Sequence, residues 1–245
     1  MKDQFLSSPL LTFFAALFAL LAVAGISYVL AWNPSARTRN RNLLIWLRRP
    51  ERHPSWERKA LTTCPQGVFP FPTDGYLGYL WGDSFRPGHT HQGIDIFSGK
   101  SPGEAPVFAV SDGFLTRLPG WKSSLILRIP SDPLRPDRQI WAYYTHLAGP
   151  DGESFIAEEY PPGSREILIT EGTLLGFQGN YSGTPGSPVG VHLHFSLVKD
   201  DGQGSFLNEL NIHNTLDPSP YFGMPLTSSY DGGPPIPCFQ KDQPS

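Results

Sequence analysis

The sequence predicts an all-β body built from short strands. The chain has 245 residues, and its 25 glycines and 26 prolines fall between short runs of Val, Ile, Leu, Phe and Tyr, which is typical of strands joined by turns. Hydrophobic residues make up 39% and aromatic residues 13%, enough for a sizeable core. Residues 191–197 alternate strictly, which places His192, His194 and Ser196 on one face of an expected strand.

The N-terminal segment has a different character. Residues 10–32 form an almost uninterrupted apolar run without a charge. At about 1.5 Å per residue, this run is long enough for a helix to cross a bilayer core of roughly 30 Å. We therefore expect residues 1–32 to be a transmembrane anchor or a signal segment, with Ala22-Val-Ala24 as a candidate cleavage site. The apolar run continues past that site, which favours the uncleaved anchor.

The next segment is basic. Residues 1–59 carry nine Lys and Arg against three Asp and Glu, leaving ten against nineteen for residues 60–245. We expect residues 33–66 to be a basic juxtamembrane linker. Six arginines follow the apolar run between positions 37 and 52, and this excess would place the body in the cytoplasm, although long domains translocate largely regardless of charge. The acidic body lacks basic clusters with interleaved aromatic residues, so no nucleic-acid partner is expected.

The body is expected to span residues 67–224. Its predicted strands lie at 107–110, 114–118, 124–129, 140–147, 166–169, 174–177 and 191–197. Two longer connections, 130–138 and 148–164, are expected to lie beside a site. Residues 225–245 are rich in proline and glycine and are expected to form an irregular tail.

Two cysteines flank this body. Cys64 and Cys238 are placed so that a disulfide between them would tie the ends of the body together, which an exported compartment would permit. Two unpaired thiols are the alternative.

Three short motifs carry the chemistry: His91-Gln-Gly-Ile-Asp95, Tyr144-Thr-His146-Leu and His192-Leu-His194-Phe. A hydrolytic zinc site usually has three protein ligands and an open fourth position. His91, Asp95 and His194 can supply such a set. The strand period of two places His192 and His194 on the same side, roughly 7 Å apart, so that one can bind metal while the other reaches the water.

The local sequence favours convergence of these side chains. Gly93 is expected to let the backbone bend so that His91 and Asp95 meet, and the residues after it enter a buried strand. A single histidine in a strand is more often a core or rim residue, but four together indicate a site. His89 is expected to play a supporting or rim role rather than to bind metal.

Taken together and in this order, the three motifs resemble those of the lysostaphin-type (LytM-like) zinc metallopeptidases, over about Gly67 to Phe222. The resemblance implies a compact antiparallel β-sheet or sandwich with one zinc ion held by His91, Asp95 and His194, and with His146 and His192 as catalytic residues. It further implies an endopeptidase that hydrolyses stem or cross-bridge peptides of peptidoglycan. The catalytic domain would then be membrane-anchored or exported, outside the cytoplasmic membrane. Ser196 stands where a glutamate is common in that family.

The expected mechanism uses a zinc ion to bring the pKa of a water toward about 7 and to polarise the scissile carbonyl. His146 or His192 accepts the proton and passes it to the leaving amine, and which of them is the base stays open. Two alternatives also stay open. One is a non-catalytic binding or activating module of cell-wall hydrolysis. The other is a cupin-like protein in which His89 and His91 bind iron or manganese and His194 is free. The sequence does not indicate which oligomeric state the protein has.

Overall fold

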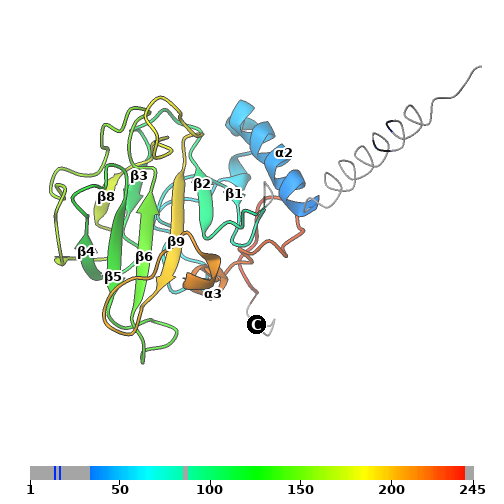
Figure 1. The fold of residues 1–245 in the computed structure, drawn as a ribbon. Coiled ribbons are helices and arrows are strands. Elements are labelled where there is room, and N and C mark those ends of the chain that lie inside the picture. Colours follow the sequence, from blue (N-terminus) through cyan, green and yellow to red (C-terminus); the bar gives the residue numbers. More distant parts are fainter. Residues whose placement is uncertain (1–13, 15–16, 18–33, 85–87, 241–245) are drawn as a thin grey trace, which may run out of the picture.

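The computed structural model describes residues 14, 17, 34–84 and 88–240 (Figure 1). Its main sheet has eight strands in the order β1-β2-β9-β6-β5-β4-β7, with β10 also paired to β9, and a second sheet pairs β3 with β8. Every pairing between these strands is antiparallel. The prediction of a mostly antiparallel β body is therefore confirmed.

The described elements follow one another along the chain with short connections. In order they are α2 (Pro34–Arg48), η1 (Pro50–Arg52), η2 (Pro54–Trp56), β1 (Tyr76–Tyr79), β2 (Ile94–Phe97), β3 (Pro106–Phe108), β4 (Gly113–Thr116), β5 (Leu125–Ile129), β6 (Ile140–Thr145), β7 (Ile167–Ile169), β8 (Leu174–Phe177), β9 (Leu193–Lys199), η3 (Ile212–Asn214), β10 (Thr215–Leu216) and α3 (Ser219–Phe222). The seven strands predicted by residue range all occur, with ends shifted by a few residues. The short strands β1 and β10 were not predicted.

One face of the large sheet forms the main core. Leu193, Phe195 and Leu197 of β9 point into it together with side chains of β3, β8 and α3. The Phe195 ring meets that of Phe222 in α3 at a centroid distance of 5.4 Å. Burial of each such side chain stabilises the fold by about 1.5–3 kcal/mol. This apolar face is the one that the alternation in residues 191–197 predicts, and it leaves the histidines on the opposite face.

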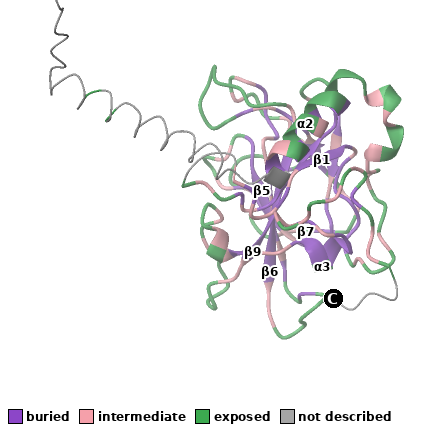
Figure 2. Cartoon of the chain, turned by 90° about the vertical axis from the view of Figure 1, so that its right-hand side faces the viewer, coloured by how far each residue is buried: buried purple, intermediate pink, exposed green. Residues whose placement is uncertain are grey.

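The helix α2 was not predicted within the basic segment. It lies beside β1 (Figures 1 and 2). Its Leu43 and Trp46 side chains make the contact, and the Trp46 ring stacks on Tyr76 with 5.6 Å between the ring centroids. Arg39 lies on the same buried side and is only 4% exposed. Pro50 follows the end of the helix, and a proline disfavours helical backbone in the residue before it. The helix is therefore part of the folded body.

The segment 1–32, predicted as an anchor or signal segment, lies outside the described residues except for Phe14 and Leu17. Among the described helices, none is long and apolar enough to cross a bilayer. At the other end, residues 225–240 are irregular, but Leu226 and Ile236 are buried in the main core. Cys64 and Cys238 form a disulfide, which settles the pairing that the sequence left open. The predicted domain boundaries stay predictions.

Candidate metal centre

The sheet register places polar side chains in a row across adjacent strands. Asp95 of β2 lies directly opposite His194 of β9, and His194 lies opposite Thr145 at the end of β6. On the other side, Tyr79 of β1 pairs with Asp95. Directly opposed residues of antiparallel strands share a face and have Cβ atoms about 4.5–5.5 Å apart. The row therefore gathers the candidate ligands on the face opposite the main core.

His91 reaches this row from the loop before β2. Its backbone N–H donates to the Asp83 carbonyl at 2.7 Å, and its own carbonyl accepts from Gly82 at 2.8 Å. Gly93 has no positive φ, so the expected bend is not the reason for a glycine there. The reason is close approach, because a Cβ at Gly93 would lie 2.1 Å from the Phe195 carbonyl oxygen. This contact lets the His91 loop lie directly against β9.

Three ligand atoms converge at the end of this loop. His91 Nε2 lies 3.0 Å from Asp95 Oδ1 and 3.0 Å from His194 Nδ1, and His194 Nδ1 lies 2.9 Å from Asp95 Oδ1. All three side chains are buried. Tetrahedral zinc with bonds of about 2.0–2.1 Å separates its ligand atoms by roughly 3.3 Å. The spacing is therefore close to what one zinc ion needs.

The orientation of His91 supports a metal ion between these atoms. His91 Nδ1–H donates to the Leu80 carbonyl at 3.0 Å, so the neutral ring turns the lone pair of Nε2 toward Asp95 Oδ1. Two acceptors at this distance repel each other unless a proton or a cation lies between them. Two imidazole nitrogens and a carboxylate oxygen are also a donor set that zinc accepts. The residues present fit the metal that the sequence predicts.

His146 and His192 lie beside this group and are held differently. His146 Nδ1–H donates to the Tyr181 carbonyl at 2.7 Å, and His192 Nδ1–H donates to the Gly190 carbonyl at 2.6 Å. Because Nδ1 of each ring bonds to the backbone, Nε2 is the nitrogen that each ring can present to the cavity. The two ring centroids are 4.5 Å apart, and His192 Nε2 lies 3.7 Å from Asp95 Oδ2. The structure thus brings together all five residues that the sequence predicts.

Burial sets the protonation of these groups. It lowers the pKa of His192 and of His194 to about 4 and also lowers that of His146. Burial opposes the charging of His91 too, but the Asp95 carboxylate outweighs it and raises the pKa of His91. Burial alone would raise the pKa of Asp95, yet the neighbouring histidines hold it well below its usual range. Metal binding requires an ionised carboxylate and neutral imidazoles, so zinc has to displace the proton that Asp95 favours on His91.

The five residues open onto a cavity of about 700 Å³. Its walls include Tyr143 of β6, Tyr181, and the half-exposed Leu44 and Leu47 of α2. His89 also lines the cavity but does not belong to the converging group. The α2 wall and the acidic residue Glu209 were not predicted from the sequence.

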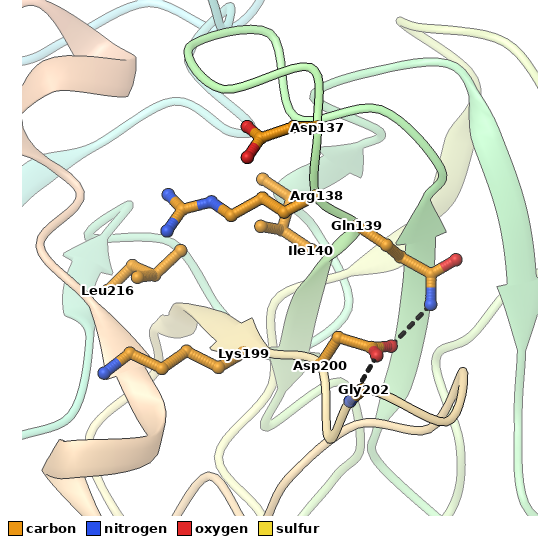
Figure 3. Close-up of a pocket in the computed structure, with 8 residues that line it drawn as sticks. All are labelled: Asp137, Arg138, Gln139, Ile140, Lys199, Asp200, Gly202 and Leu216. Carbon is orange, nitrogen blue, oxygen red and sulfur yellow. Dashed lines mark hydrogen bonds between the residues drawn. The ribbon is translucent and has the colours of Figure 1, made fainter.

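A second cavity, of about 400 Å³, lies at the far ends of β6 and β9 (Figure 3). Most of its charged and amide side chains have partners within the chain. Gln139 and the Gly202 backbone donate to the Asp200 carboxylate at 2.5 and 2.8 Å, and Arg138 pairs with Asp132. Lys199 Nζ donates to the His213 carbonyl at 2.7 Å. This cavity offers no unsatisfied group comparable to those around His91.

Comparison with known proteins gives matches among solved structures alone, since no family model and no curated protein matches the chain. The catalytic domain of lysostaphin from Staphylococcus simulans is 21% identical, with 60% of this chain and 92% of that chain covered and a TM-score of 0.40. The catalytic domain of the prophage-encoded M23 protein EnpA from Enterococcus faecalis is 18% identical, with coverages of 62% and 95% and a TM-score of 0.34.

A zinc-containing peptidase from Vibrio cholerae is 17% identical, with 63% of this chain and 40% of that chain covered and a TM-score of 0.33. The chain spans about half of whole lysostaphin, 49% of its length. These structures are of lysostaphin-type and M23 peptidases, the family that the sequence motifs resemble. At these identities and TM-scores, the likeness assigns no activity to this chain.

Proposed function

We propose that this chain is a zinc-dependent metalloendopeptidase that hydrolyses peptide bonds in the stem or cross-bridge peptides of peptidoglycan. The observation that carries the proposal is the convergence of His91 Nε2, Asp95 Oδ1 and His194 Nδ1 within about 3 Å of one another. His146 and His192 lie beside this group and could act as bases toward a water on a bound zinc ion. The choice of peptidoglycan rests on the resemblance of the three motifs.

The chemistry divides between the metal and the side chains. When bound, zinc supplies a Lewis acid that polarises the scissile carbonyl and acidifies a water. His146 and His192 are neutral at neutral pH because burial lowers the pKa of each ring, so either Nε2 can accept a proton. The charged form that results can then protonate the leaving amine. For His192, the Asp95 carboxylate 3.7 Å away stabilises that charged form.

The backbone at His146 points to a functional constraint. β6 ends at Thr145, and His146 has a φ of 71°, a left-handed conformation that is costly for a residue other than glycine. The Ala148 N–H donates to the His146 carbonyl at 2.9 Å and holds the turn. The strained turn takes His146 out of the strand, and this departure is the reason that the predicted strand 140–147 stops early.

The cupin-like alternative is weakened by the identity of the converging residues. That alternative requires both His89 and His91 as ligands and a free His194, whereas His194 belongs to the converging group and His89 does not. A non-catalytic binding module would keep the ligand group without turnover. The placement of His146 and His192 favours the enzyme over such a module.

The proposed substrate requires the body to lie outside the cytoplasmic membrane, either anchored by residues 1–32 or exported. The disulfide between Cys64 and Cys238 supports an oxidising compartment. Arg39 is one of the six arginines that favour the opposite orientation, and its charge is already paired with Asp83. This ion pair weakens the argument that the arginines after the apolar run keep the body in the cytoplasm.

The proposal is tested by incubating the zinc-loaded full chain with purified cross-linked peptidoglycans of different peptide composition. New amino termini are then quantified, and the released peptides are sequenced by mass spectrometry. We expect new amino termini from at least one wall type and none with His146→Ala. A fully metallated protein that binds the walls but releases no amino termini would instead favour the binding module.

A further inference from the structure

One carboxylate in the cavity has no role in the mechanism above. Glu209 lies between β9 and η3 and lines the same cavity as the ligand group and Tyr143. Its Oε2 atom is buried and has no hydrogen-bond partner among the described residues. A buried carboxylate oxygen without a partner carries a desolvation cost that a bound cation or donor would remove.

The position of Glu209 is set by its neighbours. The Leu210 N–H donates to Asn208 Oδ1 at 3.1 Å, and Asn214 Nδ2 donates to the Asn208 carbonyl at 2.8 Å. Gln92, next to His91, donates to the Leu210 carbonyl at 2.9 Å. These bonds hold the segment around Glu209 against the metal-ligand loop, and none of them uses the Glu209 carboxylate. The backbone around Glu209 is therefore held in place by bonds that leave Oε2 of its carboxylate without a partner.

The other charged groups that the structure describes in the cavity do not pair with Glu209. No lysine or arginine lines the cavity among the described residues. Asp95, the other carboxylate in the lining, already contacts three histidines. Burial raises the pKa of Glu209 to about 7, while the charge of His91 opposes this rise. No described residue donates a hydrogen bond to Glu209 Oε2, so a donor for this atom has to come from a bound molecule.

We propose that Glu209 binds an ammonium group of the substrate, a primary amine carried by the peptide close to the scissile bond. The inference rests on the proposed peptidase function and specifies its substrate class. A carboxylate withdrawn from water forms charge-assisted hydrogen bonds with an ammonium group, and these are stronger than neutral ones. Among the residues that the structure describes, no lysine or arginine lines this cavity to pair with a terminal carboxylate, so we expect cleavage at internal bonds of amine-bearing peptides.

The test compares two forms of one substrate. Soluble cross-linked peptides prepared from peptidoglycan are used before and after acetylation of their primary amines, and kcat/KM is measured with the zinc-loaded full chain. We expect the free-amine form to be preferred by about 10-fold or more. In Glu209→Gln this preference falls to near 1, mainly through a higher KM for the free-amine form. The matched control Glu171→Gln, an exposed acid between β7 and β8, keeps the full preference.

Each other outcome is decisive. Equal kcat/KM for the two forms in the wild-type chain, or a preference that persists in a folded Glu209→Gln, overturns the assignment. If the wild-type chain cleaves neither form, the proposed function fails first. Calorimetric titration of the wild-type chain and Glu209→Gln with the same two peptides then decides the role of Glu209. Tighter binding of the free amine by the wild-type chain alone supports that role, and equal affinities overturn it.

Discussion

Arg39 of α2 and Asp83 of the loop before His91 form a buried ion pair, with Arg39 Nε 3.1 Å from Asp83 Oδ2. The same Asp83 carboxylate accepts from the Leu80 N–H, and the Asp83 backbone carbonyl accepts from the His91 N–H at 2.7 Å. The ion pair therefore connects the helix outside the sheet to the backbone that carries a metal ligand.

Arg39→Ala should lower the free energy of unfolding by about 3–5 kcal/mol, because it leaves the Asp83 carboxylate buried without its partner. Chemical denaturation followed by fluorescence measures the loss. Arg41→Ala, at an exposed position two residues further along α2, is the matched control and should change stability by less than about 0.5 kcal/mol. Equal effects of the two substitutions would show that the ion pair does not tie α2 to the body.

Substitutions in the site should separate metal binding from turnover. Asp95→Ala and His194→Ala should lose both zinc and activity, because each removes one of three ligands. His146→Ala should retain most of the zinc but lower kcat by about 10²–10⁴-fold, as expected for a group that transfers protons. Metal content is measured by mass spectrometry and turnover by release of amino termini. Retained activity in Asp95→Ala would remove Asp95 from the ligand set.

Gly93→Ala should disturb the site through the sheet. The added methyl group would lie 2.1 Å from the Phe195 carbonyl oxygen, so β2 and β9 have to move apart where Asp95 faces His194. We expect a loss of stability of about 1–3 kcal/mol, as for other overpacked positions, together with weaker zinc binding. Gly120→Ala, where the new methyl group meets no atom within 4 Å, should leave both unchanged. Normal zinc affinity in a folded Gly93→Ala would contradict the close-approach explanation.

Glu209→Gln should stabilise the protein in a pH-dependent way. Burial raises the pKa of Glu209 from 4.5 to about 7, so between these values the folded protein holds a proton that the unfolded chain has lost. The wild-type carboxylate therefore costs stability increasingly as the pH rises through this range. Relative to the wild-type chain, Glu209→Gln should gain about 1–2 kcal/mol at about pH 8 and almost nothing at about pH 4. Thermal unfolding at the two pH values measures the gain, and a gain independent of pH would rule out a desolvated carboxylate.

Much of the site could be predicted because its determinants are local. His192 and His194 follow the period of a strand, and Asp95 lies in a short buried strand that the neighbouring isoleucines indicate. The register that sets Asp95 opposite His194 is not local, but in both strands the residues that flank these two are buried in the main core, which limits how the strands can pair.

The parts that were missed depend on distant partners. The large apolar residues of α2 form one continuous run, residues 43–47, rather than a helical repeat, and the burial of Arg39 is explained by Asp83, 44 residues away. Glu209 lies outside the three motifs, and only the folded chain brings it beside His91 through the Gln92–Leu210 hydrogen bond. Neither contact leaves a periodic signal in the sequence.

The central claim is that one zinc ion, held by His91, Asp95 and His194, makes this chain a peptidase. The most direct measurement removes metal from the full chain with a chelator, restores it with zinc, and follows release of amino termini from cross-linked peptidoglycan. We predict one zinc per chain, no release after chelation and recovery on adding one equivalent of zinc. Release that is unchanged in the metal-free protein, or no release from the fully zinc-loaded protein, would contradict the claim.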